Sequence, residues 1–174
     1  MKVGIISDTH TKSSIAKLAL DMLIKNGAEF IIHAGDIVEL ETLELLKNCS
    51  KDYIAVYGNN DAHLVCKHNN YNLVQEPHYF ELEDVKFKLM HLPFYMSPDA
   101  EVIIFGHTHT FEVEFTNGTL FLNPGENCAR NKPLSECAML EVCEDEFFVT
   151  YYKKGRREHD LFENEKFSFI RTKS

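Results

Sequence analysis

The first half of the chain alternates between short apolar runs and segments in which apolar side chains recur at helical spacing. The runs have the length of buried strands and contain β-branched residues. In the longer helical segment, Ser13 or Ser14 can supply the N-cap, and Gly27 ends the pattern. This β-α-β-α-β order predicts parallel strands joined by right-handed crossovers. The predicted strands are residues 3–7, 30–33 and 53–57; the predicted helices run from the serine cap to about residue 26 and over residues 41–46.

The second half predicts strands and hairpins. Asn117-Gly118 is a strong hairpin-turn signal, and Glu83-Asp84 and an acidic segment after residue 142 mark two further turns. Together with the first half, this predicts two sheets with a helical layer on at least one side. The predicted strands are residues 79–82, 86–91, 102–105, 111–115, 119–122, 138–142 and 147–152. Residues 62–76 are predicted to be a loop or short helix, and the pattern assigns no element to residues 154–174.

Length and charge narrow the classes of protein to consider. The 174 residues suit one domain, residues 1–174, in which residues 154–174 form a C-terminal extension of unassigned structure. The net charge of −9 argues against stable nucleic-acid binding, which needs basic surface to replace phosphate counterions. The basic cluster at residues 153–157 is expected to be a solvated surface segment rather than a binding patch.

The cysteines and the N-terminus indicate the compartment. Five cysteines, none in a CxxC spacing, argue against a disulfide framework or a cysteine zinc site. Asp8 interrupts the first apolar run too early for a signal peptide, and no apolar stretch approaches membrane-spanning length. These features predict a reduced, cytoplasmic protein that does not enter a membrane.

Five of the apolar runs lead into side chains that can bind a metal. Ligand sites in open α/β sheets form outside the carboxyl ends of the strands, so these side chains are expected to meet in one crevice. Donors two residues apart are expected to point the same way, as they do in extended chain. Gly35, Gly58 and Gly106 precede donors, which suits tight turns and close backbone approach. The donors are Asp8, His10, Asp36, Asn59, His91, His107 and His109.

The donor set favours two metals over one. Seven oxygen and nitrogen donors exceed the needs of one ion, and the lack of a thiolate suits Mn, Fe, Zn, Co or Ni. Two carboxylates leave two divalent ions with net positive charge, which should attract a phosphate even in an acidic protein. Each cluster alone is more often an N-cap, a structural histidine or a turn than a functional site. Their recurrence after five strands favours the metal site.

These motifs together resemble those of the calcineurin-like metallophosphoesterases. Ser7-Asp8-Thr9-His10 and Asn123-Pro124-Gly125 narrow the resemblance to small prokaryotic phosphodiesterases, which are similar to the retromer scaffold subunit; it spans about residues 1–150. The resemblance implies a two-sheet α/β sandwich with helical outer layers. It also implies that Asp36 bridges two metals. One metal would be held by Asp8, His10, Asp36 and His109, and the other by Asp36, Asn59, His91 and His107.

Three departures from the family pattern bear on the chemistry. Asn60 stands where many members carry a histidine that donates a proton to the leaving group, and small members of this type often lack it too. His91-Leu92-Pro93 replaces a His-Gly-His motif. Residues 93–101 are too few for a helix that often lies there, which is expected to open the mouth of the site.

The resemblance implies a hydrolase, a two-metal phosphodiesterase that attacks a small-molecule phosphate ester with a metal-activated water. The expected catalytic residues are Asp36, Asn59 and His91, and Asn59 and Asn60 are expected to bind substrate. The expected cofactors are two divalent ions, first of all Mn, with Fe, Zn, Ni or Co as alternatives. A metal-binding scaffold protein with weak or no catalysis is the alternative function, and a homo-oligomer stays open.

The other histidines and Cys128 are expected to lie outside the chemistry. His33 falls within a predicted strand and is expected to be structural. His63 and His68 follow the third motif and are expected on the surface rather than in catalysis. Cys128 is expected to be a packed, inert thiol, because oxygen and nitrogen donors already suffice.

Overall fold

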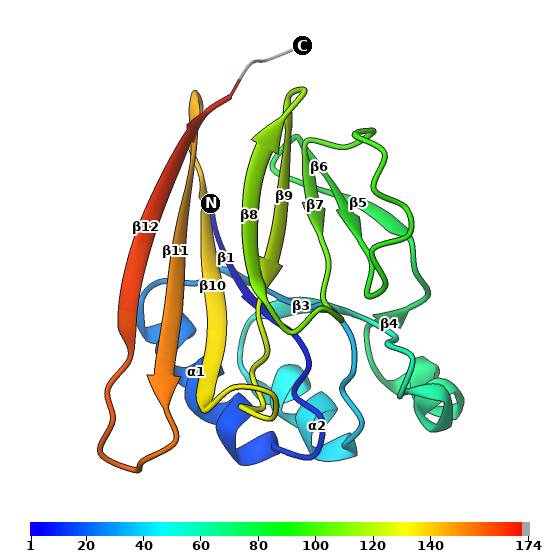
Figure 1. The fold of residues 1–174 in the computed structure, drawn as a ribbon. Coiled ribbons are helices and arrows are strands. Elements are labelled where there is room, and N and C mark those ends of the chain that lie inside the picture. Colours follow the sequence, from blue (N-terminus) through cyan, green and yellow to red (C-terminus); the bar gives the residue numbers. More distant parts are fainter. Residues whose placement is uncertain (172–174) are drawn as a thin grey trace.

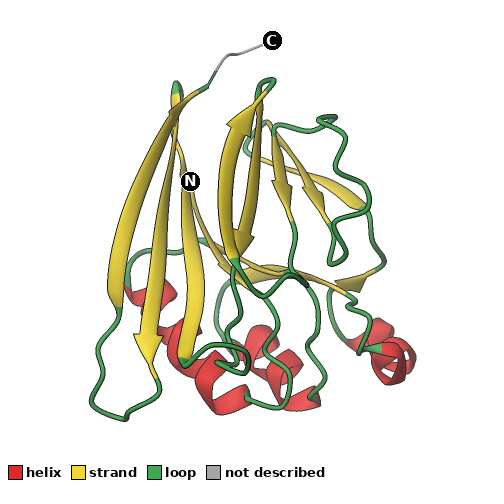
Figure 2. Cartoon of the chain, in the orientation of Figure 1, coloured by secondary structure: helices red, strands yellow, loops and turns green. Residues whose placement is uncertain are grey.

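The computed structural model describes residues 1–171 and consists of two stacked sheets with helices on one outer side (Figures 1 and 2). Residues 172–174, the end of the predicted extension, lie outside the described residues. The helices are α1 (Ser13–Lys25), α2 (Leu40–Asn48) and the 3-10 helix η1 (Ala62–Asn70). No helix among residues 1–171 is both long and apolar enough to cross a membrane.

The larger sheet carries the predicted parallel strands. Its order is β12-β11-β10-β1-β2-β3-β4, in which β1 to β4 are parallel and β10 to β12 are antiparallel. The bounds are β1 (Lys2–Ile6), β2 (Phe30–His33), β3 (Asp52–Val56), β4 (Leu73–Val74), β10 (Leu134–Val142), β11 (Glu146–Gly155) and β12 (Glu163–Ile170).

The smaller sheet has the order β5-β6-β7-β9-β8, with β6, β7 and β9 parallel. Its hairpins turn at Glu83-Asp84 and Asn117-Gly118, as predicted. Its strands are β5 (His78–Leu82), β6 (Val85–Leu89), β7 (Val102–Ile104), β8 (Phe111–Thr116) and β9 (Thr119–Pro124). The predicted strands and helices are therefore present, with ends shifted by a few residues.

Strand β1 is buried on both faces, which explains its continuous apolar sequence. Val3 and Ile5 belong to the core between the two sheets, whereas Ile6 packs with the helices on the opposite face. Gly4 also faces the helices, because a Cβ there would lie 2.9 Å from Ile31 Cδ1. A strand covered on both faces cannot alternate apolar and polar residues, so it reads as a continuous apolar run.

Within residues 1–171 the helices pack on the larger sheet, so the helical layering that the resemblance implied lies on one outer face. Residues 90–100 follow β6 without forming a helix, and Met90, Met96 and Ala100 pack over Ile103 and Phe105 on the outer face of the smaller sheet. Lys88, 1% exposed, anchors this segment with an ion pair of 2.8 Å to Asp99. The short segment therefore replaces a helix, as its length predicted.

Two further details differ from the sequence prediction. Helix α1 begins at Ser13, but its N-cap is Lys12, without a side-chain cap. The Ser13 N–H donates instead to Glu39 Oε2 at 3.1 Å, so the residue before α2 satisfies the start of α1. Strand β12, which no pattern assigned, pairs with β11 at the sheet edge and packs Phe167 and Phe169 inward.

Candidate metal centre

The predicted donors follow the strand ends but do not lie in extended chain. Asp8 and His10 have φ values of 53° and 44°, and Asp36 has 55°. His107 and His109 likewise have φ values of 67° and 58°. The expectation that extended spacing aims each pair was therefore wrong. Left-handed residues turn the chain sharply, and such backbone persists at functional sites when its surroundings fix it.

Four predicted donors form one compact group. Asp8, His10, Asp36 and His109 each offer a ligand atom, and these atoms all lie within 4.8 Å of one another. His109 Nε2 is 3.2 Å from Asp8 Oδ1, and His10 Nε2 is 3.7 Å from Asp36 Oδ2. Two carboxylates and two imidazoles at these separations can surround one divalent ion.

Two atoms of this group are buried without a hydrogen bond. Within residues 1–171, Asp8 Oδ1 and His10 Nε2 have no hydrogen bond. Such atoms are rare inside proteins, because an unsatisfied buried polar group costs about 1–3 kcal/mol. Burial also raises the pKa of Asp8 and lowers the pKa of His10 from their ordinary values. A bound cation would satisfy both atoms and favour the charged carboxylate, so the group fits a metal.

Neighbouring oxygens set the tautomers of two histidines. His109 Nδ1 lies 2.5 Å from Glu126 Oε2, and His91 Nδ1 lies 2.8 Å from the Ala34 carbonyl oxygen. In both rings Nδ1 is the donor, so Nε2 is the atom that faces the candidate site. His91 Nε2 carries a proton toward Asp36, and a bound ion would take the place of that proton. Sequence reasoning did not identify Glu126 as part of this arrangement, since a single Glu in a loop carries no spacing pattern.

A second group of donors lies on the other side of Asp36. His91 Nε2 is 3.5 Å from Asp36 Oδ1 and 3.1 Å from Asn59 Oδ1. The His107 ring stands edge-on to His91, with centroids 5.2 Å apart. Asn59 and His107 are exposed, whereas His91 is buried. All seven predicted donors are thus brought to one region, with Asp36 between a buried group and a more open one.

Asn60 and His91 both contact the Asp36 carboxylate. The Asn60 backbone N–H donates to Asp36 Oδ1 at 3.0 Å, and the Asn60 amide donates to Oδ2 at 2.7 Å. Burial would raise the pKa of Asp36, but hydrogen bonds from His91 and Asn60 bring it well below its ordinary value. Asp36 therefore stays a carboxylate. Burial acts to lower the pKa of His91, but Asp36 raises it above its ordinary value overall.

The three predicted glycines lie where no side chain fits. A Cβ at Gly35 would lie 2.6 Å from His91 Nδ1. A Cβ at Gly58 would collide with the backbone N of Asp36, and one at Gly106 with Ser7 Oγ. These close approaches bring separate loops together at the donors, which confirms the reading of the glycines.

Two buried residues support the loops without offering ligand atoms. Asp61 accepts backbone N–H bonds from Ile37, Val38 and Gly58, so it ties the loop after β2 to the loop after β3. His33 accepts from the Gly35 N–H at 3.2 Å and contacts Thr9 Oγ1 at 3.0 Å. Burial lowers the pKa of His33 to about 3, so the ring is neutral.

His63 and His68 lie on the surface, as expected, and Cys128 is a buried thiol. His63 and His68 are exposed and contact backbone carbonyls of Val38 and Val65. Cys128 Sγ lies close enough to His10 and His109 to form a second candidate group. Burial, with a smaller contribution from the Glu126 charge, raises the pKa of Cys128 to about 11, so the protonated thiol is favoured.

Comparisons with known proteins agree with the geometry. A model of the calcineurin-like phosphoesterase superfamily domain matches residues 1–145. Phosphodiesterase MJ0936 of Methanocaldococcus jannaschii is 30% identical over 161 residues, covering 84% of this chain and 96% of that protein. The structure of an archaeal phosphodiesterase matches with a TM-score of 0.74 and 26% identity, covering 96% of this chain and 100% of the other. A Vps29 point mutant of Entamoeba histolytica has a TM-score of 0.77 with coverage of 97% and 99%; at 22% identity it shows a shared fold alone.

Proposed function

Because this chain belongs to the calcineurin-like phosphoesterase superfamily, we propose that it is a phosphodiesterase that works with two divalent metals. The observation that carries the proposal is the group of Asp8, His10, Asp36 and His109, in which two buried ligand atoms have no hydrogen bond within residues 1–171. Buried atoms of this kind are costly unless a ligand satisfies them.

In this proposal, Asp8, His10, Asp36 and His109 hold one ion. The more exposed group holds the second ion; its members are Asp36, Asn59, His91 and His107. Asp36 is shared between the two ions. Bound ions would polarise the phosphate and lower the pKa of an attacking water. The oxygen and nitrogen donors suit Mn first, and also Fe, Zn, Ni or Co.

The side chains around Asp36 orient the reacting groups. His91 keeps its Nε2 directed toward Asp36 because its Nδ1–H is fixed by the Ala34 carbonyl oxygen. Asn59 and Asn60 are exposed beside Asp36, so their amides are placed to bind phosphate oxygens. Asp36, Asn59 and His91 are thus the proposed catalytic residues, and Asn59 and Asn60 the proposed substrate-binding ones.

The lack of a proton donor at Asn60 favours diesters with good leaving groups as substrates. An amide such as that of Asn60 donates hydrogen bonds but does not transfer its proton, and general acid catalysis is worth about 10²–10⁴-fold. Without it, an alkoxide departs slowly. We therefore favour phosphodiesters over alkyl monoesters as substrates.

The proposed setting is a reducing compartment, the cytoplasm. All five cysteines are free, at positions 49, 66, 128, 137 and 143, which suits a compartment that keeps thiols reduced. The proposed substrate is a small phosphate ester rather than a nucleic-acid polymer, because a protein of net charge −9 would repel a polyanion over most of its surface.

Hydrolysis of bis(p-nitrophenyl) phosphate tests the proposal. Purified protein should release p-nitrophenolate with added Mn²⁺ and lose this activity in EDTA, and Asp8→Asn should be inactive with a wild-type circular dichroism spectrum. Glu114→Gln, an exposed carboxylate on β8, is the matched control and should keep the activity. Equal, negligible turnover of several esters with Mn²⁺ and with EDTA would contradict the proposal.

A metal-binding scaffold protein is the second candidate. It is favoured by Asn60 in place of a proton donor and by Phe94 and Tyr95, which are 74% and 50% exposed on the segment after His91. Metal analysis after incubation with Mn²⁺, together with an assay of several esters, separates the two functions. Bound metal with turnover supports the enzyme, and bound metal without turnover supports the metal-binding scaffold.

A further inference from the structure

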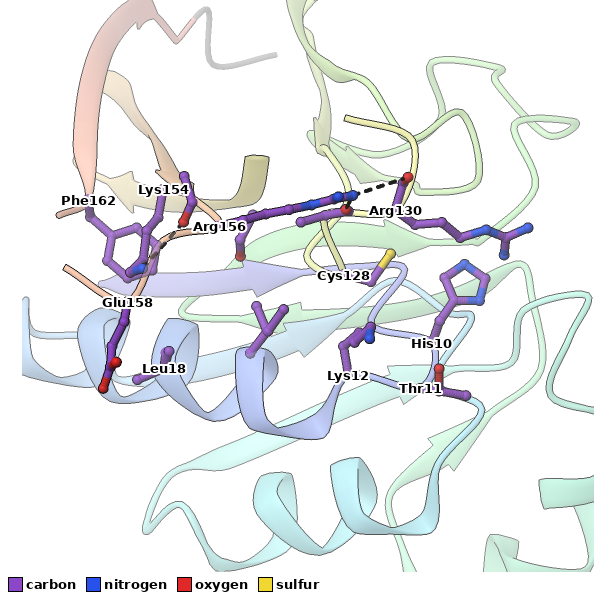
Figure 3. Close-up of a pocket in the computed structure, with 14 residues that line it drawn as sticks. His10, Thr11, Lys12, Leu18, Cys128, Arg130, Lys154, Arg156, Glu158 and Phe162 are labelled. Atoms are coloured by element: carbon purple, nitrogen blue, oxygen red, sulfur yellow. Dashed lines mark hydrogen bonds between the residues drawn. The ribbon is translucent and has the colours of Figure 1, made fainter. Parts of the chain in front are cut away.

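A cavity of about 770 Å³ opens beside the metal group (Figure 3). His10 belongs to both, because its ring lines the cavity and its Nε2 joins the metal group. The start of α1, the loop at residues 128–130 and the β11–β12 connection form the walls. Its volume lies within the usual range of small-ligand sites, about 300–1,000 Å³.

The wall of this cavity is strongly basic in an acidic protein. Lys12, Arg130, Lys154 and Arg156 line it, against the single carboxylate of Glu158. The basic cluster at residues 153–157 was expected to be a solvated surface segment. In the structure, only some of its side chains line the cavity. Lys154 and Arg156 face the cavity, whereas Arg157 pairs with Asp160 at 3.1 Å.

Two of the four cations already have partners. The Arg156 guanidinium donates to the Ala129 carbonyl oxygen, and the Lys154 ammonium donates to the Arg157 carbonyl oxygen at 3.0 Å. These bonds fix the wall. Within residues 1–171, the heads of Lys12 and Arg130 make no hydrogen bond and no ion pair, so both can take an anion.

Apolar side chains also line the cavity. Ile15 and Leu18 from α1 and Phe162 from the β11–β12 connection line it. Leu18 is 51% exposed where it lines this cavity. A ligand with an apolar or planar body would cover it, and removing this apolar surface from water is favourable. In Figure 3, Arg130 and His10 lie at one end of the cavity, and Leu18 and Phe162 lie at the other, together with Lys154 and Glu158.

We propose that this cavity binds one arm of the diester substrate, and that this arm is nucleoside-like and carries a second phosphate. Lys12 and Arg130 bind the second phosphate, and Ile15, Leu18 and Phe162 contact the base or sugar. The inference rests on the proposed function and names its substrate class. An arginine suits phosphate because its guanidinium can donate two parallel hydrogen bonds.

Two substrates that differ only in the second phosphate test this proposal. Thymidine 5′-(p-nitrophenyl phosphate) and its 3′-phosphorylated form release the same p-nitrophenolate. With Mn²⁺, the wild type should show kcat/KM at least about tenfold higher for the phosphorylated substrate, the effect of one charge-assisted contact. Arg130→Gln and Lys12→Gln should each lower this ratio toward one. Lys25→Gln, an exposed lysine at the far end of α1, should leave the ratio unchanged.

The failures of the two proposals are distinguishable. If the wild type hydrolyses both substrates with a ratio near one, or if Arg130→Gln and Lys12→Gln keep the wild-type ratio, the cavity proposal is wrong and the phosphodiesterase stands. If neither is hydrolysed, the proposed function fails, and calorimetry decides the cavity separately. Thymidine 3′,5′-bisphosphate should then bind more tightly than thymidine 5′-monophosphate in the wild type but not in Arg130→Gln. Equal binding of the two in the wild type would overturn the cavity proposal.

Discussion

Glu126 accepts a hydrogen bond of 2.5 Å at its Oε2 from Nδ1 of the His109 ring. The same carboxylate is fully buried, and its Oε1 accepts the backbone N–H groups of Asn131 and Lys132 at 2.7 Å each. Burial would raise the pKa of Glu126, but the bond to His109 lowers it overall. A charged carboxylate behind a metal-binding imidazole fixes the tautomer and increases its basicity.

The first prediction concerns this carboxylate. Glu126→Gln places an amide N–H against either His109 or the two backbone donors, so it leaves a donor facing a donor. Affinity for the first Mn²⁺ should fall about 10–100-fold, as for other partners of ligating histidines. Calorimetric titration measures it, with Glu114→Gln as the exposed control. An unchanged affinity in a folded Glu126→Gln protein would show that Glu126 does not act on the metal.

The second prediction separates a shared ligand from an unshared one. Asp36 lies within 3.7 Å of His10 Nε2 and 3.5 Å of His91 Nε2, on the two sides of the centre. Asp36→Asn should therefore weaken both metals and abolish turnover, whereas His109→Ala should chiefly weaken one. Mn²⁺ titration of each variant decides. Two ions held as tightly in Asp36→Asn as in the wild type would refute the bridging role.

The third prediction concerns the leaving group. If no acid replaces the missing histidine, the wild type should prefer aryl diesters strongly over alkyl monoesters. Asn60→His should raise alkyl monoesterase activity more than aryl diesterase activity, within the range of about 10²–10⁴-fold for general acid catalysis. The measurement is kcat/KM for aryl and alkyl esters in both proteins. Little dependence on the leaving group in the wild type would reveal another proton donor.

The fourth prediction uses the buried His33. Its pKa is about 3 in the folded protein against 6.5 ordinarily, so between these values the unfolded chain binds the extra proton. The stability contribution of neutral His33 is full above pH 6.5 and falls as the pH drops, by up to about 1.4 kcal/mol per pH unit.

His33→Asn keeps an acceptor for the Gly35 N–H and removes this titration. Urea unfolding in EDTA at pH 7, 6 and 5 should show a shallower loss of stability in His33→Asn than in wild type. The exposed His159→Asn is the control and should follow wild type. Parallel pH profiles for wild type and His33→Asn would mean that His33 is not the group responsible.

Sequence patterns predicted those strands whose apolar residues are also buried in the folded protein. The strands around Val3 and Ile5 are covered on both faces, so burial left a continuous apolar run. Strand β12 carried no such signal, because only Phe167 and Phe169 of its eight residues pack on the core. Glu163, Glu165 and Lys166 are exposed on an edge strand, and their charge made the segment resemble an irregular one.

The site was predictable by residue type but not by backbone geometry. Asp8 and His10 follow a strand in the expected spacing, yet left-handed φ values aim them. The partners of the donors were not predictable, because Glu126 lies 17 residues from His109 and Asn60 lies 24 residues from Asp36. The basic cavity combines Lys12, Arg130 and Lys154, which share no motif and meet only in the folded chain.

The left-handed backbone at the donors has a consequence for evolution and engineering. Each non-glycine residue in that conformation costs roughly 1–2 kcal/mol relative to right-handed backbone, whereas glycine adopts it freely. Asp8, His10, Asp36 and His109 therefore carry a backbone cost that glycine would not. Asp8, Asp36 and His109 offset it through hydrogen bonds to neighbouring loops, whereas His10 Nε2 is buried without one within residues 1–171. A library selected for heat resistance alone, in the presence of a chelator, should therefore drift toward glycine first at His10.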